Sequence, residues 1–475
     1  MAASDELALP DWTARVRLGD RALLSRLTVP VYANVAGMSP PCDPVRAAIV
    51  TAMDELAARG AAAGWGLLGA RELLRARLAA LVGVAADEIG LVPNTTTGLR
   101  AIAFGLPWQP GDRVIGFDGE FPANVTPWQQ AAAAFGGTLT LLPLQTWSQP
   151  EAGLAALEQA LAGGRVLAVA VSAVQFASGL RMPLQEIGAR CRAHGAALVV
   201  DGIQACGAVP VDCAALGIDA LACGGHKWLG GAMGLGFVAM RHAFARTLRP
   251  RVAGWTSHED GAAFLLQGPG LLRYDRPVRA RADFVEDGGS ALAPVPGLAA
   301  AARATARART PRPSRRARAK VTALEPALCE RGFTSLRGAA ARGAFGHPRA
   351  PTTAGRRRGR AAPCARRARG VACAISMACS ASRRTGRTTS TRSRACSRPS
   401  TRVAEPACGC VVANNVRTPT LWALPTSEPI AIARHLAIER TALLVPPRAQ
   451  LGHATRREGV KFAKSLGLGT GRPTC

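Results

Sequence analysis

The sequence is poor in acidic and aromatic residues. Its 475 residues include 31 Asp and Glu against 59 Lys and Arg, and aromatic residues make up 5% of the chain. The formal net charge of +28 ordinarily indicates a nucleic-acid or other acidic partner. No uninterrupted apolar run approaches the roughly 20 residues that a membrane-spanning helix needs, so we expect no membrane segment. The stretch Met1–Pro10 contains acids and lacks an apolar core, so we also expect no secretory signal.

Cysteines lack the spacing of a metal site. Of the 13 cysteines, Cys42, Cys191, Cys206, Cys213 and Cys223 precede Gly297, and no two of them stand at zinc-site spacing. The other eight follow Gly297, where Cys408 and Cys410 are close but lack further ligands at the required distance along the chain. We therefore predict no metal, reduced thiols and a cytoplasmic location.

The excess positive charge lies in one segment. Residues 301–402 contain 25 Arg and one Lys against two Glu, which accounts for +24 of the net +28. Most of the segment is rich in Ala, Arg, Thr and Ser, without a sustained hydrophobic period or interleaved aromatic residues. These absences disfavour a nucleic-acid-binding surface. Two interpretations stay open: a basic segment that contacts phosphates, and a coding sequence that is read out of frame.

The chain before Gly297 alternates between strand-like and helix-like stretches. This alternation predicts an α/β fold with a mostly parallel sheet covered on both faces. The predicted strands are Arg113–Phe117, Thr138–Leu144, Arg165–Val171, Ala196–Val200, Ile218–Ala222 and Leu235–Met240. The predicted helices include Pro44–Arg59, Leu67–Val82, Leu99–Leu106, Glu151–Leu161 and Leu184–His194.

Asp201 and Lys227 stand just after two of these strands. Lys227 lies in the glycine-bracketed turn Gly224–Gly231, and Asp201 ends the apolar run Ala197–Asp201. Each alone is an ordinary surface lysine or a helix cap. As a pair they suit pyridoxal 5'-phosphate (PLP): the amine condenses with the cofactor aldehyde, and the carboxylate keeps the pyridine nitrogen protonated. In open α/β sheets, ligands bind at this end of the strands.

A candidate phosphate site lies upstream. The stretch Leu91–Gly98 leads from an apolar run into a helix-like stretch and contains Thr95 and Thr96. Hydroxyls and free backbone N–H groups at a helix N-terminus bind anions. The alternative is an ordinary threonine cap.

In this order, the motifs resemble those of class V aminotransferase-fold PLP enzymes, which include cysteine desulfurases, kynureninase and isopenicillin-N-epimerase-like proteins. The resemblance extends from about Val31 to Gly297. It implies PLP-dependent transferase fold type I, with an N-terminal segment 1–30, a large PLP-binding domain 31–297 and a small-domain remnant 298–475. It further implies a homodimer and a transferase, lyase or epimerase reaction on an amino acid.

The resemblance also assigns roles to single residues. Lys227, Asp201 and His226 would be catalytic, and His226 would also contact the phosphate region. Phe121, in the stretch Glu120–Asn124, would stack on the cofactor ring. The remaining cofactor-binding residues would be Thr95 and Thr96 at the phosphate, Gln204 at the ring hydroxyl, and Ser290, whose loop reaches the neighbouring subunit's phosphate in family dimers.

Two departures from the family bear on the reaction. Desulfurase-like members have a Ser-Asn pair after the strand equivalent to Leu167–Val171, and the Asn helps hold the substrate carboxylate. The aligned residues here are Gln175 and Phe176, which disfavours cysteine desulfuration. Gly224 replaces a serine that often assists the phosphate. The substrate therefore stays open.

The region after Gly297 keeps family character only in islands. These are Val321–Leu328, Gly370–Ile375, Arg417–Trp422 and Ile430–Arg440. We favour the hypothesis that much of 298–475 is out of frame, so that the small domain is degraded or disordered. The arginine that clamps the substrate carboxylate in the family cannot be matched. We therefore expect PLP binding with little turnover, and an inactive PLP-fold protein is the alternative.

Overall fold

The computed structural model describes residues 21–32, 34–289, 291–307, 312–331, 334–335 and 348–349. Its centre is a seven-stranded sheet in the order β1-β7-β6-β5-β4-β2-β3. Strand β7 runs antiparallel to both neighbours, and the other pairs are parallel. The strands are β1 (Ile89–Val92), β2 (Arg113–Asp118), β3 (Thr138–Pro143), β4 (Val166–Ser172), β5 (Ala197–Asp201), β6 (Ala220–Gly224) and β7 (Gly236–Met240).

The predicted α/β fold with a mostly parallel sheet is confirmed. Each predicted strand matches one of β2 to β7 to within two residues at either end, whereas the four-residue strand β1 was not predicted. Strand β4 is buried at every position, as expected for a central strand covered on both faces.

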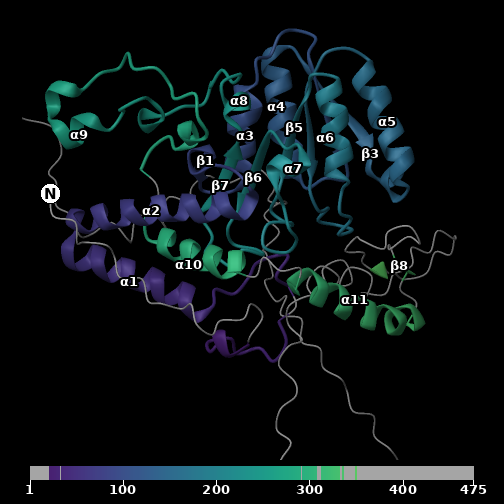
Figure 1. Ribbon diagram of the computed structural model, residues 1–475, viewed down its shortest axis with the longest axis horizontal. Helices are drawn as coiled ribbons and strands as arrows, with labels where there is room; N and C mark the ends of the chain where they lie inside the picture. The colour runs from purple at the N-terminus through teal and green to yellow at the C-terminus, as the bar shows by residue number, and fades with distance from the viewer. Residues whose placement is uncertain are drawn as a thin grey trace, which may run out of the picture. The chain divides into compact units, whose positions relative to one another are not determined.

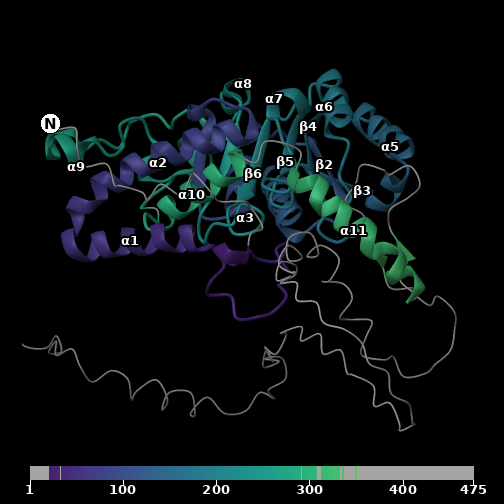
Figure 2. The same ribbon diagram turned by 60° about the horizontal axis from the view of Figure 1, so that its bottom comes forward.

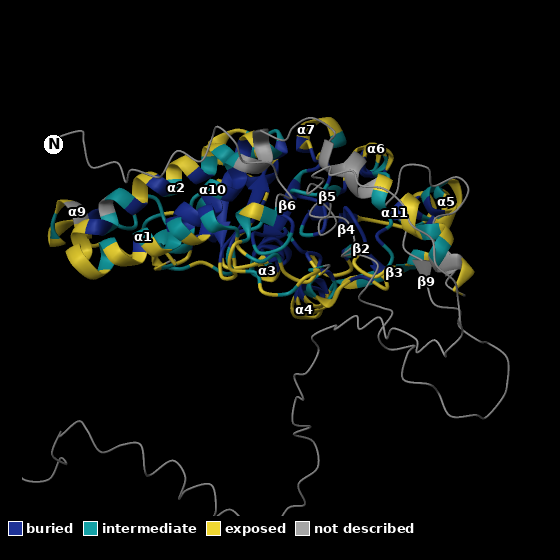
Figure 3. Ribbon diagram, turned by 90° about the horizontal axis from the view of Figure 1, so that it is seen from below, coloured by how far each residue is buried: buried dark blue, intermediate teal, exposed yellow. Residues whose placement is uncertain are grey.

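Helices cover both faces of the sheet (Figure 1). Successive residues of a strand point to opposite faces of the sheet and pack in two separate hydrophobic cores. In β5, Leu198 and Val200 belong to the core on one face, and Val199 belongs to the core on the other face. Figure 3 shows the dark blue sheet between these two helix layers. The first layer contains α2 (Ala61–Val82), α5 (Pro150–Ala162), α6 (Leu184–Ala193) and α7 (Cys213–Leu216). The second layer contains α3 (Thr95–Gly105), α4 (Thr126–Phe135) and α8 (His242–Ala245).

Helix α10 (Pro294–Arg307) packs beside α1 (Asp43–Arg59) and α2 (Figures 1 and 2). A Cβ added at Gly297 would lie 2.6 Å from Ile49 Cγ1, so the glycine permits this close approach. Arg77 of α2 donates to the Ala299 carbonyl over 2.7 Å. Our expected domain boundary at 297 therefore falls inside a helix. The start of the basic segment is also folded, because its alanines are small enough to be buried against α1 and α2.

The basic segment contains a second helix, α11 (Arg312–Glu330). This helix includes the island Val321–Leu328 and begins upstream of it, in sequence that has a low-complexity composition. Ala and Arg are strong helix formers, which explains this upstream start. The other islands lie outside the described residues. Short strands β8 (Thr334–Ser335) and β9 (Pro348–Arg349) pair with each other.

Shorter elements complete the described chain. They are η1 (Arg21–Leu23), η2 (Ala86–Glu88), η3 (Pro122–Asn124), η4 (Leu144–Ser148), η5 (Trp255–Ser257), α9 (Ala263–Gln267), η6 (Pro269–Leu271) and η7 (Ala282–Val285). Among the described helices, none combines the length and the apolar composition of a membrane span.

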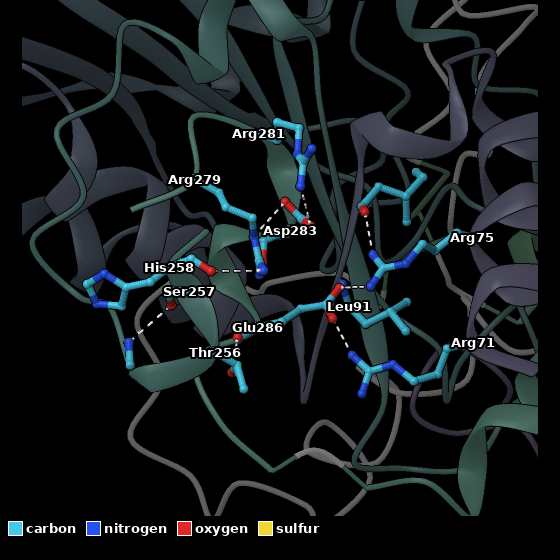
Figure 4. A network of polar contacts seen from close by, with 12 residues as sticks. Arg71, Arg75, Leu91, Thr256, Ser257, His258, Arg279, Arg281, Asp283 and Glu286 are labelled. Atoms are coloured by element: carbon cyan, nitrogen blue, oxygen red, sulfur yellow. Dashed lines mark hydrogen bonds and ion pairs between the residues drawn. The ribbon is translucent and has the colours of Figure 1, made fainter. Parts of the chain in front are cut away.

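Strand β1 is an edge strand whose backbone is covered by side chains. The Glu286 carboxylate accepts the Leu91 N–H over 2.8 Å, and Arg75 donates to the Ile89 carbonyl over 2.7 Å. Figure 4 shows Arg71 and Arg75 of α2 both directed at Glu286. Because Glu286 follows η7, this cluster fastens the segment around η7 to α2 and the sheet.

Candidate active site

The predicted site residues gather at one edge of the sheet. Strands β1, β2, β4, β5 and β6 all end there, because β1 is antiparallel to β7 and therefore parallel to the others. The ends of these strands and the segments that follow them supply Thr95, Phe121, Gln175, Asp201 and Lys227. The topology thus brings together residues that are up to 132 positions apart in sequence.

Asp201 is the most deeply buried acid of this edge, with 2% of its surface exposed. Among the described residues, its carboxylate accepts one hydrogen bond, from the Ile203 N–H over 2.9 Å, and forms no salt bridge. Burial raises the pKa of Asp201 to about 7, Glu120 adds to the rise, and the charge of Lys227 opposes it. A cationic group bound next to this buried carboxylate would stabilise its ionised form.

Lys227 lies in a tight turn between β6 and β7. The Gly225 N–H bonds to the Leu235 carbonyl over 2.9 Å, and the Gly230 N–H bonds to the Lys227 carbonyl over 2.9 Å. Its ammonium lies above the Phe121 ring, 5.7 Å from the centroid. The reactive amine and a flat aromatic face are therefore neighbours.

Phe121 is unusually exposed for an aromatic residue, at 46%. It packs edge-to-face against Phe176, with centroids 5.3 Å apart and planes at 80°. Phe176 is itself 39% exposed. Two accessible aromatic rings therefore lie at the sheet edge beside the Lys227 amine, where a planar ring has a surface on which to stack.

The candidate phosphate residues converge at the start of α3. Asn94 caps this helix by accepting the Thr97 N–H over 2.9 Å. The N–H groups of Thr95 and Thr96 lie in its first turn, where no intrahelical acceptor exists. The Thr95 hydroxyl accepts the Gly224 N–H over 2.9 Å, which ties the helix start to the turn that carries the lysine.

His226 lies in the same turn, directly before Lys227. A Cβ added at Gly224 would lie 3.1 Å from its ring, so the glycine leaves room for the imidazole. Burial and the neighbouring Lys227 lower the pKa of the half-buried His226, which favours the neutral imidazole. A neutral imidazole can donate one hydrogen bond to an anion.

Gln204 has partners that the sequence did not predict. Its amide nitrogen donates to the Ala36 carbonyl over 3.1 Å, and its oxygen accepts the Trp228 indole N–H over 2.6 Å. The side chain therefore fastens the segment around Ala36 to the loops after β5 and β6. A contact with a cofactor ring would use the second amide hydrogen.

Glu120 is a buried residue to which sequence reasoning gave no role. Its carboxylate accepts the Ser172 N–H over 2.7 Å, the Ser172 hydroxyl, and the Gln175 amide over 2.9 Å. The Gln175 side chain is fully buried and hydrogen-bonded to Glu120, whereas the next side chain of this loop, Phe176, is exposed. Only the position of Glu120 directly before Phe121 could have drawn attention to it.

Two further sequence predictions concern the surroundings. Ser290 lies outside the described residues, so its place is not given. Cys42, Cys191, Cys206, Cys213 and Cys223 are all free thiols. Within the described part of the chain, no group of three His, Cys, Asp or Glu residues is arranged to hold a metal ion.

Part of this chain is similar in sequence to known proteins. A family model described as Aminotransferase class-V matches residues 48–262. A cysteine desulfurase of Dickeya dadantii is 36% identical over 189 residues, which is 39% of this chain and 45% of that protein. An isopenicillin N epimerase of Amycolatopsis lactamdurans is 30% identical over 193 residues, covering 39% and 48% respectively. The chain thus spans about half the length of these curated relatives.

Solved structures extend the likeness. A variant of C-DES with glycine covalently linked to its PLP cofactor superposes with a TM-score of 0.62 and 26% identity, covering 68% of this chain and 84% of that one. Another structure of C-DES, named there a cystine C-S lyase, contains its product cysteine persulfide and gives a TM-score of 0.60. Residues 48–262 of this chain are therefore similar to class V aminotransferases, and the fold resembles that of C-DES.

Proposed function

We propose that this protein is a PLP-dependent enzyme that acts on an amino acid through Lys227. The observation that carries the proposal is the buried Asp201 carboxylate, which forms no ion pair among the described residues, together with the Lys227 amine over the exposed Phe121 ring. A carboxylate in this setting requires a cationic partner, and a protonated pyridine nitrogen is one. The cofactor found in C-DES supports the same choice.

The residues of the site fit this cofactor part by part. The Asp201 carboxylate would accept the ring N–H, and Phe121 would stack against the ring face. The first turn of α3, with Thr95 and Thr96, would donate backbone and hydroxyl hydrogens to the phosphate. His226 would add a neutral donor from the opposite side.

When bound, PLP supplies an aldehyde with which amines condense and a ring that absorbs electrons released at the neighbouring carbon. Lys227 would be the amine that holds the cofactor, and its neutral form would serve as a base for substrate protons. Backbone hydrogen bonds fix the turn from which this side chain extends. Asp201 would keep the ring nitrogen protonated, which is the condition for electron withdrawal.

The loop after β4 bears on the reaction type. The Gln175 side-chain amide donates a hydrogen bond to Glu120, and Phe176 presents an aromatic ring in the place of the family's carboxylate-binding Asn. We therefore favour transamination, β-elimination or epimerisation over cysteine desulfuration. The substrate carboxylate would need another partner.

A second copy of the chain is the partner that we propose. Apolar side chains on the α1 and α2 surfaces are exposed: Val50 by 40%, Met53 by 53%, Leu68 by 43% and Leu73 by 39%. Exposure of apolar side chains along adjacent helices is typical of an interaction surface. Ser290 would then act at the phosphate of the neighbouring subunit. Free thiols, four of them buried, accord with the cytoplasm as location.

The decisive experiment is chemical identification of the bound amine. The purified full chain is incubated with PLP, reduced with borohydride and digested, and the peptides are analysed by mass spectrometry. The proposal requires a phosphopyridoxyl group on the peptide that contains Lys227. Modification spread over Lys320, Lys461 and Lys464 without preference would contradict it. Specific modification without any change of amino acids would identify an inactive PLP-binding protein instead.

A further inference from the structure

Glu120 is a buried carboxyl group for which the proposed chemistry has no task. It is 7% exposed and lies in the loop after β2, one residue before Phe121. A buried acid normally has a cationic partner. Among the described residues, the partners of Glu120 are instead neutral donors from the end of β4, namely Ser172 and Gln175.

The same strand end connects Glu120 to Asp201. Ser172 and Asp201 are directly paired across β4 and β5, and the Ala173 N–H bonds to the Asp201 carbonyl over 2.9 Å. Adjacent strands lie about 4.8 Å apart. Glu120 is therefore hydrogen-bonded to the end of β4, and Asp201 lies at the paired position of β5.

We propose that Glu120 is a positioning residue that acts through Asp201. Its carboxylate places a fixed negative charge beside Asp201 and so strengthens the binding of a protonated ring nitrogen by Asp201. This inference rests on the function proposed above and adds a residue to it. Burial raises the pKa of Glu120, and the hydrogen bonds from Ser172 and Gln175 oppose this rise, so they would favour the ionised form and hold the charge in place.

The surroundings of Asp201 support this role. Three titratable groups face it: Glu120 from the loop after β2, Cys223 from β6 and Lys227 from the turn after β6. Burial raises the pKa of Cys223 well above its usual value, so this thiol stays neutral. Glu120 therefore raises the pKa of Asp201, and Lys227 lowers it. Of these two groups, Glu120 is the one that favours the binding of a positive charge next to Asp201.

The consequence for binding depends on pH in a specific way. Below the pKa of Asp201, this carboxyl group carries a proton, which the protonated ring must displace. The negative charge of Glu120 strengthens the binding of the proton and of the ring to Asp201 equally, so the affinity for the ring does not change. Above that pKa the carboxylate is already ionised, and Glu120 strengthens the binding of the ring alone. Glu120→Gln should therefore weaken binding at high pH and leave it unchanged at low pH.

The test uses the full chain and 4'-deoxypyridoxine 5'-phosphate, which has the ring nitrogen and phosphate of PLP but no aldehyde. Its dissociation constant is measured by calorimetry between pH 5 and pH 8.5 for wild type and Glu120→Gln. We expect a loss of about three- to tenfold above pH 7.5 and little change below pH 5.5. An equal loss at every pH would mean that Glu120 acts only on the structure and would overturn the proposal.

Two further variants make the result specific. In an Asp201→Asn background, Glu120→Gln should produce no pH-dependent change, because the group through which it acts is gone. The pH dependence of urea unfolding, measured without any ligand, gives a second readout: Glu120→Gln should move the Asp201 titration to lower pH. If the wild type does not bind the probe, the result counts against the proposed function. If the Asp201 titration in urea unfolding is the same in Glu120→Gln and in the wild type, this inference is overturned whether or not the probe binds.

Discussion

The Trp228 indole N–H donates to the Gln204 side-chain oxygen over 2.6 Å, and both groups are buried. Gln204 follows Asp201 by three residues, and Trp228 directly follows Lys227. This bond therefore fixes the two loops that carry the proposed catalytic pair. The distance between the carboxylate and the amine depends on it.

Trp228→Phe should lower stability and cofactor affinity together. The substitution leaves the Gln204 oxygen buried without its donor, which costs about 1–3 kcal/mol. Thermal unfolding and titration with PLP measure the two effects. Trp147→Phe is the matched control, because the buried Trp147 N–H has no hydrogen-bond partner in the described structure. Equal losses in both variants would show that the Gln204 bond has no special role.

Lys227→Ala should abolish the visible absorbance that PLP acquires on condensation with a protein amine. No other residue of the described site offers an amine beside Phe121. Absorbance spectra after dialysis measure the loss, and Lys320→Ala should retain the wild-type spectrum. A borohydride-stable adduct of normal yield in Lys227→Ala would refute the assignment.

Asp201 should make stability depend on pH. Its pKa rises from 3.8 to about 7 on folding, so the folded state binds a proton more tightly than the unfolded state. Its stabilising contribution is therefore complete below about pH 4 and is lost as pH rises toward 7, by at most roughly 4 kcal/mol. Urea unfolding of wild type and Asp201→Asn between pH 4 and pH 8 isolates this contribution. A difference between the two proteins that stays constant with pH would contradict it.

Glu286→Gln should destabilise the fold far more than a comparable surface change. The substitution removes the charge between Arg71 and Arg75, and breaking a buried ion pair of this kind costs about 3–5 kcal/mol. Glu158→Gln is the control, because Glu158 pairs with Arg190 and His194 while its side chain stays 51% exposed. An exposed pair contributes about 0–1 kcal/mol. Similar midpoints of thermal unfolding for the two variants would contradict the importance of the Glu286 cluster.

The chain as written should bind PLP with little turnover of any amino acid. The proposed large domain contains every described residue of the cofactor site, whereas the expected substrate clamp belongs to 298–475. Reading the coding DNA in its other two frames tests the cause: a periodic, apolar small domain should emerge in one of them. Robust turnover by the 475-residue chain, with a protease-resistant segment 301–402, would overturn both expectations.

Much of the fold followed from local sequence patterns. The strands β4, β5 and β6 are continuous apolar runs, and such runs predict central strands of a doubly covered sheet wherever they occur. Asp201 and Lys227 could be placed because each directly follows such a run. Helix α10 was not predicted, because its Ala-rich and Arg-rich sequence was interpreted as low-complexity although Ala and Arg are strong helix formers.

The side-chain contacts of the site were less accessible to sequence analysis. Gln204 was expected at a ring hydroxyl, yet its observed partners are Ala36 and Trp228, which lie 168 and 24 residues away. The Glu120 network joins residues 52 and 55 positions apart. Hydrogen bonds of this kind form between loops that only the folded sheet brings together, and no local pattern encodes them.

The cover over β1 restricts how copies of this protein can associate. An uncovered edge strand offers its N–H and C=O groups to a strand from another molecule. Here the Leu91 N–H is taken by Glu286 and the Ile89 carbonyl by Arg75, so a visiting strand would have to displace two charged side chains. Growth of the sheet from one molecule into the next is thereby blocked at this edge. Association at this edge would therefore have to use side chains instead of backbone hydrogen bonds.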